Sequence, residues 1–204
     1  MHFEFLLEEA SAEKMLAGLL PRLLPENASW RFLVFRGKPD LLKHLPARLK
    51  GYRDWLPADH RIVVLVDQDR EDCREIKARL EDAARQAGLL TKTKAGKQKH
   101  FSIVNRVAVE EIESWFLGDP NALRMAFSRL PSHFERQKKY RHPDSIAGGT
   151  AEALERLLQR AGYYLAGMPK TEVAGLVGRH LDPAANSSPS FNAFVRGVAA
   201  LARA

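Results

Sequence analysis

The chain has 204 residues, of which 45% are hydrophobic and 28% are charged, and its formal net charge is +7. This composition is typical of a soluble globular protein with one substantial core, and no apolar run approaches the roughly 20 residues of a membrane span. Cys73 is the only cysteine, which excludes an internal disulfide and a cysteine-based zinc site and favours a reducing, cytoplasmic location. The positive charge favours a polyanionic partner such as nucleic acid.

Segments typical of strands alternate with segments typical of helices over the first two-thirds of the chain. Strands are expected over residues 3–7, 31–35, 62–66 and 101–109. The strand at 62–66 is aliphatic throughout, as in a central strand buried on both faces. Helices are expected between the strands, with Ser11 and Asp40 as caps, and the lysine-rich stretch 89–100 is expected to be a loop. The alternation predicts an α/β fold, Rossmann-like, with a mainly parallel sheet.

The character of the sequence changes after about residue 130. Residues 131–149 are basic and contain Pro and Gly, whereas the remaining apolar spacing is helical, with Pro189 at the start of the last helix. We therefore expect an α/β domain over residues 1–130 and a basic linker with a helical C-terminal extension over 131–204.

Carboxylates follow three of the expected strands. Glu8 follows the first, and Asp67 and Asp69 follow the third. After the fourth come Glu110, Glu111 and Glu113. In a parallel sheet these ends meet at one edge, and two carboxylates 4 Å apart repel by about 4 kcal/mol at an effective dielectric near 20. A hard divalent cation relieves that repulsion, and oxygen ligands favour Mg²⁺ or Mn²⁺.

The same acids have a simpler interpretation. An acid after a strand often caps the next helix, and Asp69 or Asp72 could do so. A lysine or arginine that permanently neutralised the cluster would also count against metal chemistry. The Asp-x-Asp spacing after an apolar strand, together with the other acidic strand ends, favours a metal site.

Five segments spread over nearly the whole chain carry a resemblance to a known family. They are residues 5–13 (FLLEEASAE), 37–41 (GKPDL), 66–73 (VDQDREDC), 111–119 (EIESWFLGD) and 186–191 (NSSPSF). In these segments and their order the chain resembles a bacterial domain-of-unknown-function family, forty-two seventy-six in that series, with a Toprim-like fold related to the Toprim domains of OLD-type nucleases.

The resemblance implies residue roles and partners. Glu8 matches the Toprim glutamate, Asp67 and Asp69 match the metal-binding pair, and Glu111 and Glu113 match the family's own acidic motif. It implies a Mg²⁺- or Mn²⁺-dependent nuclease that acts on DNA or RNA, with an AAA- or SMC-like ATPase partner in phage defence. One departure is that Glu9 stands where Toprim proteins usually have Gly.

Basic residues are candidates for contact with phosphates. Lys38 follows Gly37 after a strand, but the surrounding residues are not a P-loop; Lys38 is either a phosphate-neutralising catalytic residue or an exposed turn lysine. Two basic segments, the second interleaved with Phe134 and Tyr140, are candidates for nucleic-acid binding or for plain solvated surface. Their candidate residues are Lys92, Lys94, Lys97, Lys99, Arg136, Lys138 and Lys139.

The sequence leaves two functions open. The first is a metal-dependent nuclease with catalytic residues Glu8, Asp67, Asp69, Glu111 and Lys38. Its metal ligands would be Glu8, Asp67, Asp69, Glu111 and Glu113. The second is a non-catalytic Toprim-like subunit that regulates or recruits such an ATPase system. Trp115 is expected to be a core anchor in either case.

Overall fold

The structure is a computed structural model that describes residues 1–55, 57, 59–96 and 100–204. The chain divides into two compact units, and each is described by itself. Unit 1 comprises Met1–Glu9, Leu23–Val107 and Ala193–Ala204, and unit 2 comprises Ala10–Arg22 and Ala108–Asn192. The expected boundary at residue 130 stays a prediction.

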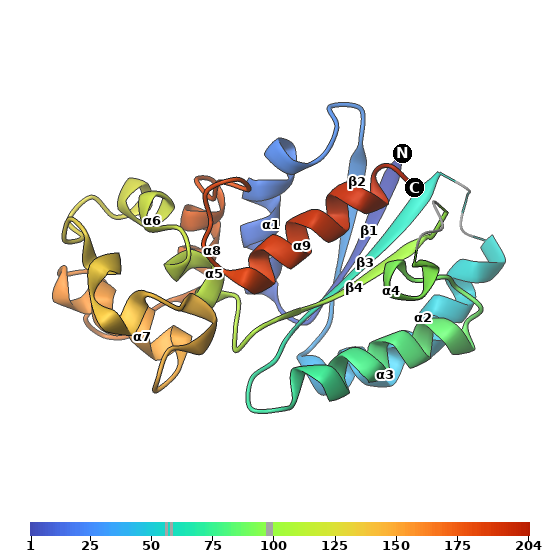
Figure 1. Ribbon diagram of the computed structural model, residues 1–204, viewed down its shortest axis with the longest axis horizontal. Coiled ribbons are helices and arrows are strands. Elements are labelled where there is room, and N and C mark those ends of the chain that lie inside the picture. Colours follow the sequence, from blue (N-terminus) through green and yellow to red (C-terminus); the bar gives the residue numbers. More distant parts are fainter. Residues whose placement is uncertain (56, 58, 97–99) are drawn as a thin grey trace. The chain divides into compact units, whose positions relative to one another are not determined.

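Unit 1 is built on a parallel sheet with strand order β2-β1-β3-β4 (Figure 1). The strands are β1 (His2–Leu7), β2 (Ser29–Val34), β3 (His60–Asp67) and β4 (Ile103–Ala108). Register pairs Leu7 of β1 with both Val34 of β2 and Leu65 of β3, so these three strands end nearly level. The predicted α/β fold with a Rossmann-like parallel sheet is confirmed.

Two helices cover one face of this sheet (Figure 1). They are α2 (Lys38–Trp55) and α3 (Cys73–Gln86). Their buried side chains form one core with alternate residues of β1 and β3; its members include Leu6, Leu41, Leu45, Leu49, Ile62, Val64, Val66, Ile76 and Leu80. Residues 62–67 of β3 are all buried, as predicted for a central strand.

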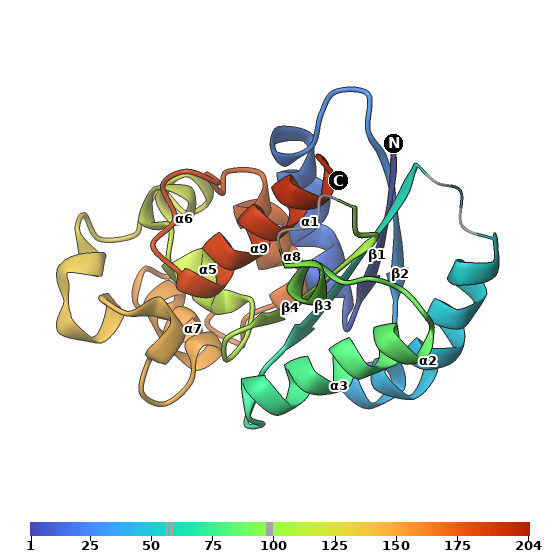
Figure 2. The ribbon, with the colours of Figure 1, turned by 45° about the vertical axis from the view of Figure 1, so that its right-hand side comes forward.

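The opposite face of the sheet is contacted by the C-terminal part of α9 (Pro189–Leu201) (Figure 2). Arg106 Nε of β4 donates to the carbonyl of Ala193 at 2.9 Å, and Arg61 Nε of β3 donates to that of Leu201 at 3.2 Å. Side chains alternate along a strand, so these arginines lie on the face opposite to Ile62.

Two predicted caps are wrong. Helix α2 begins at Lys38, which puts Asp40 inside its first turn, where Oδ2 accepts the backbone N–H of Arg36 at 3.0 Å. Helix α1 begins at Ala10, so Ser11 is a buried residue within the helix.

The expected loop at 89–100 contains a short helix, α4 (Lys92–Ala95). It forms because the Thr91 side chain accepts the backbone N–H of Lys94 at 3.2 Å and caps the turn. The loop prediction is corrected for these residues, whereas residues 97–99 lie outside the described part of the chain.

Apart from Ala108, the last residue of β4, the regular secondary structure in the described residues of unit 2 is helical. Its elements are α1 (Ala10–Leu23, through Arg22), α5 (Glu113–Leu117), α6 (Pro120–Ala126), the 3-10 turns η1 (Phe134–Arg136), η2 (Lys138–Tyr140) and η3 (Pro143–Ser145), α7 (Thr150–Arg160), α8 (Lys170–Gly178) and the first residues of α9. Pro189 begins α9, as predicted. None of the helices described in either unit is both long and apolar enough to cross a bilayer.

Candidate acidic site at the carboxyl ends of the strands

Glu8 and Asp67 meet at the carboxyl edge of the unit 1 sheet. Glu8 follows β1, Asp67 ends β3, and Glu8 Oε2 accepts the backbone N–H of Asp67 at 3.0 Å. The two strands are parallel neighbours, which is why acids 59 positions apart in the sequence reach each other. Asp67 is 7% exposed and Glu8 is half-buried, so this contact is largely shielded from water.

Lys38 supplies the positive charge of this cluster. Its Nζ donates to Asp69 Oδ2 at 2.7 Å and to the Gln68 carbonyl at 3.0 Å, and lies 3.2 Å from Glu71 Oε1. The Lys38 side chain is only 5% exposed, whereas those of Asp69 and Glu71 are about half exposed. Lys38 is therefore a buried member of the acidic site and not an exposed turn lysine.

The backbone around Asp69 directs its carboxylate to this lysine. Asp69 has φ of 52°, in the left-handed region that Asp tolerates better than most residues. The turn continues to Asp72, whose Oδ1 accepts the Arg74 N–H at 2.7 Å and caps α3. Asp72 thus takes the capping role, and Asp69 is left at the strand end.

Burial and neighbouring charges alter the ionisation of Glu8 and Lys38. Burial raises the pKa of the Glu8 carboxyl, and although the Asp67 N–H and the Lys38 charge oppose this, the net shift is upward. Burial lowers the pKa of Lys38, but its bonds to Asp69 and Glu71 outweigh that effect, so the net shift of its pKa is also upward. Glu8 thus holds a proton more readily than an exposed glutamate, while Lys38 stays charged.

The raised pKa of Glu8 predicts a pH-dependent stability that Glu8→Gln removes. Between the unfolded and folded pKa values the folded protein binds more protons than the unfolded chain, so this carboxyl makes stability fall as pH rises through the interval. Relative to Glu8→Gln, the wild-type free energy of unfolding should increase as pH falls through the raised pKa, then level off below the ordinary glutamate pKa. Urea unfolding at a series of pH values measures the difference; a constant difference would contradict the prediction.

The donor set at this edge suits Mg²⁺ or Mn²⁺ in chemistry, because Glu8, Asp67 and Asp69 offer only carboxylate oxygens. The geometry of the site does not yet form a metal-binding group. Among the described residues, no three His, Cys, Asp or Glu side chains are grouped closely enough to hold a metal ion. Lys38 stands as the counter-charge for Asp69 instead. For Asp69 to be a metal ligand, the cation would have to replace Lys38 there.

Glu111 and Glu113 belong to unit 2 and are likewise paired with a lysine. Lys170 Nζ lies 2.9 Å from Glu111 Oε1 and 3.8 Å from Glu113 Oε1, and Glu113 is 1% exposed. Lys170 was not identified from the sequence, because it lies 59 positions from Glu111 and nothing in its own surroundings marks it.

The role of the segment at 186–191 is explained within unit 2. Asn186 Nδ2 donates to the Trp115 carbonyl at 2.7 Å, and Trp115 Nε1 donates to Ser190 Oγ at 2.8 Å. A Cβ on Gly118 would lie 2.3 Å from Asn186 Oδ1, so only glycine allows this approach. The 111–119 and 186–191 segments therefore form one packed structure, with Trp115 as the buried anchor that was predicted.

The candidate nucleic-acid residues in the two basic segments are mostly at the surface. Lys94, Arg136, Lys138 and Lys139 are exposed and Lys92 is partly exposed, whereas Lys97 and Lys99 lie outside the described residues.

The rings beside the second basic segment do not suit base stacking. Phe134 and Tyr140 are 1% and 3% exposed and pack edge to face against each other, with ring centroids 5.4 Å apart. They belong to the core of unit 2, so of the two interpretations of this segment the structure favours core packing for its rings.

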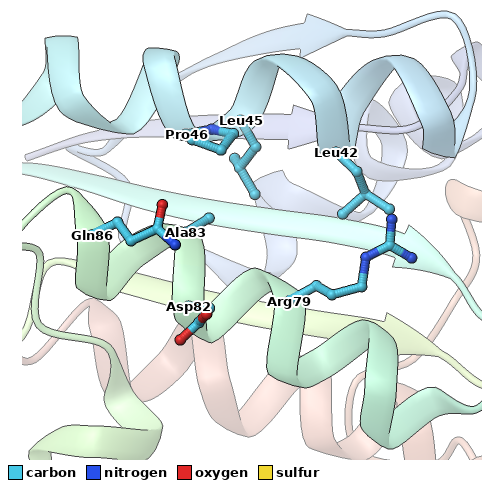
Figure 3. Close-up of a pocket in the computed structure, with 7 residues that line it drawn as sticks. All are labelled: Leu42, Leu45, Pro46, Arg79, Asp82, Ala83 and Gln86. Atoms are coloured by element: carbon cyan, nitrogen blue, oxygen red, sulfur yellow. The ribbon is translucent and has the colours of Figure 1, made fainter.

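A cavity of about 230 Å³ lies between α2 and α3 on the helical face of unit 1 (Figure 3). Its lining is Leu42, Leu45, Pro46, Arg79, Asp82, Ala83 and Gln86. Arg79 also bonds Glu71 Oε2 at 3.1 Å, which links the cavity rim to the carboxylate that Lys38 contacts. The cavity contains no residue predicted to be functional.

Fold and site together define an α/β protein whose parallel strands end in an acidic cluster that contains a buried lysine. Residues 7–199 match the family described as Domain of unknown function (DUF4276), and the chain belongs to that family. No curated protein and no solved structure gives a significant match.

Proposed function

We propose that this protein is a metal-dependent phosphodiesterase of nucleic acid, with its active site at the strand-end edge formed by Glu8, Asp67, Asp69 and Lys38. The observation that carries the proposal is the 3.0 Å bond from the Asp67 N–H to Glu8, which joins the ends of two parallel strands. Carboxyl ends of parallel strands are where α/β proteins place their sites. The meeting of the glutamate and the Asp-x-Asp pair also supports a Toprim-like relation to OLD-type nucleases.

Asp67 and Asp69 would hold Mg²⁺ or Mn²⁺, which supplies polarisation of a phosphoryl oxygen and a lower pKa for an attacking water. Glu8 binds a proton readily because burial raises its pKa, so it suits the transfer of a proton to or from the reacting groups. Lys38 stays cationic and, once released from Asp69, can hold a phosphate oxygen. Glu111 and Glu113 of unit 2 would be the ligands of a separate metal ion.

The proposed setting follows from the same residues and from the resemblance. The net charge of +7 suits a nucleic-acid substrate. Cys73 is a free thiol, in keeping with a cytoplasmic location. An AAA- or SMC-like ATPase partner and a role in phage defence remain part of the proposal.

The proposal is tested by cleavage of labelled DNA and RNA by the purified protein with Mg²⁺, Mn²⁺ or EDTA. Cleavage should require the metal and should fall by about 10²–10⁴-fold in Glu8→Gln, since a positioned proton-transfer group contributes that much. Glu26→Gln is the matched control, because Glu26 is exposed in the turn before β2. Equal rates in wild type and Glu8→Gln, or cleavage that EDTA does not stop, would rule out the mechanism.

One observation favours the second candidate, a non-catalytic regulatory or recruitment subunit. Lys38 already neutralises Asp69 and Glu71 with short contacts of 2.7 Å and 3.2 Å. If these pairs are permanent, the acidic edge is a structural ion-pair network. Under this alternative the protein, with or without a bound metal, shows no cleavage in the presence or absence of an ATPase partner.

A further inference from the structure

Two cationic side chains converge on one backbone carbonyl of the edge strand β4. Lys77 Nζ of α3 donates to the Asn105 carbonyl at 2.7 Å, and Arg106 Nη1 of β4 donates to the same oxygen at 2.8 Å. Because β4 is the last strand of the sheet on this side, the contact lies along an edge of unit 1. Two positive groups on one neutral oxygen repel each other and make the edge electropositive.

Two further cations act on this pair. Burial is the largest cause that lowers the pKa of Lys77 and of Arg106, and Glu81 opposes it in both. The charge of Arg106 and then that of Lys92 lower the pKa of Lys77 further, and the charge of Arg196 lowers that of Arg106. Lys92 comes from α4 and Arg196 from the unit 1 part of α9, so four elements contribute to the cluster. Figures 1 and 2 show α3, α4 and α9 around β4.

Against the larger effect of burial, the carboxylate of Glu81 raises the pKa of both Lys77 and Arg106, and both of its oxygens already have partners. Glu81 Oε1 lies 2.6 Å from Lys77 Nζ and accepts the Asn105 side-chain amide at 3.1 Å, while Oε2 accepts the Thr91 hydroxyl. Within the described part of the chain, the hydrogen bonds of the Arg106 side chain go to neutral carbonyls, those of Asn105 and Ala193. Among the described residues, Glu81 is thus the carboxylate that the electrostatics of both Lys77 and Arg106 identify, and its oxygens are already bonded.

We infer that the β4 edge, through Lys77, Lys92, Arg106 and Arg196, binds the phosphate backbone of the nucleic-acid substrate. The inference deepens the proposed function and rests on it. Cations spread over four elements suit a run of phosphates, which DNA presents at about one charge per 1.7 Å of duplex. Since β4 is parallel to β3, a backbone that follows β4 leads to the strand-end acids.

The test is the affinity of the full chain for a fluorescein-labelled DNA duplex and its single strand, measured by anisotropy in EDTA at several salt concentrations. Arg196→Ala and Lys92→Ala should each weaken binding whatever the sequence, and each should reduce the slope of log affinity against log salt by about 0.9 for duplex. Arg48→Ala, the same charge loss on the exposed side of α2, should leave the slope unchanged.

Equal effects of Arg196→Ala and Arg48→Ala would overturn the inference, since binding would then follow net charge alone. Displacement of the DNA by polyglutamate at equal charge concentration would overturn it in favour of an acidic protein partner. Failure of the proposed chemistry is distinguishable: in that case binding still depends on Arg196, but no cleavage occurs with metal. Conversely, metal-dependent cleavage together with unchanged DNA affinity in Arg196→Ala would overturn the binding role of the β4 edge while the proposed active site stands.

Discussion

Asp67→Asn is expected to reduce metal-dependent cleavage of nucleic acid on the order of 10³-fold. The substitution keeps the shape of a side chain that is 7% exposed and keeps the backbone N–H that Glu8 accepts, but it removes the negative charge that a metal requires. Asp67→Asn should therefore lower the rate of cleavage and leave the thermal stability of the protein unchanged. Initial rates with Mn²⁺, together with thermal unfolding of the same samples, measure both.

Asp82→Asn is the matched control for this result. Asp82 is exposed on α3 and bonds Arg85 at 2.9 Å, so its neutralisation should leave the rate of cleavage within about twofold of wild type. If Asp67→Asn cleaves as fast as Asp82→Asn, then Asp67 has no catalytic role.

Trp115→Ala is expected to lower the free energy of unfolding by about 3–5 kcal/mol. The ring is fully buried, packs edge-on against Phe191 with centroids 5.3 Å apart, and bonds Ser190 through Nε1. Truncation leaves a cavity and removes the hydrogen bond to the Ser190 hydroxyl where the two segments of unit 2 meet. Urea unfolding followed by circular dichroism measures the loss.

Trp55→Ala gives the comparison for Trp115→Ala. Trp55 is 56% exposed at the end of α2 and contacts only one ring, that of Tyr52, among the ring contacts in the described chain. Its loss should cost less than about 1 kcal/mol. Similar costs for the two tryptophans would show that Trp115 does not anchor the 186–191 segment.

The fold could be predicted because its signals are local. The apolar run at 62–66 and the helical spacing around it fix the strands and helices, and parallel pairing then follows from their alternation. The errors lie at the first residues of helices, because a single hydrogen bond can determine where a helix begins. Asp40 accepts the backbone N–H of Arg36 from within the first turn of α2, so it does not precede the helix as its cap.

The acidic site could be predicted only in part. The pairing of Glu8 with Asp67 follows from strand adjacency, which the alternation implies. The burial of Lys38 between Asp69 and Glu71 does not, since it depends on where α2 begins and on the left-handed turn at Asp69. The same holds for the cluster at β4, because Lys77, Arg106 and Arg196 are far apart in sequence and carry no motif.

The proposed metal site depends on whether a divalent cation can take the place of Lys38 at Asp69. Calorimetric titration with Mn²⁺ tests it directly in wild type, Asp69→Asn and Lys38→Met. We expect binding to wild type, weaker binding to Asp69→Asn, and at least about tenfold tighter binding to Lys38→Met, because a cation 4 Å away costs about 4 kcal/mol at an effective dielectric near 20. No Mn²⁺ binding by wild type and Lys38→Met alike would contradict it.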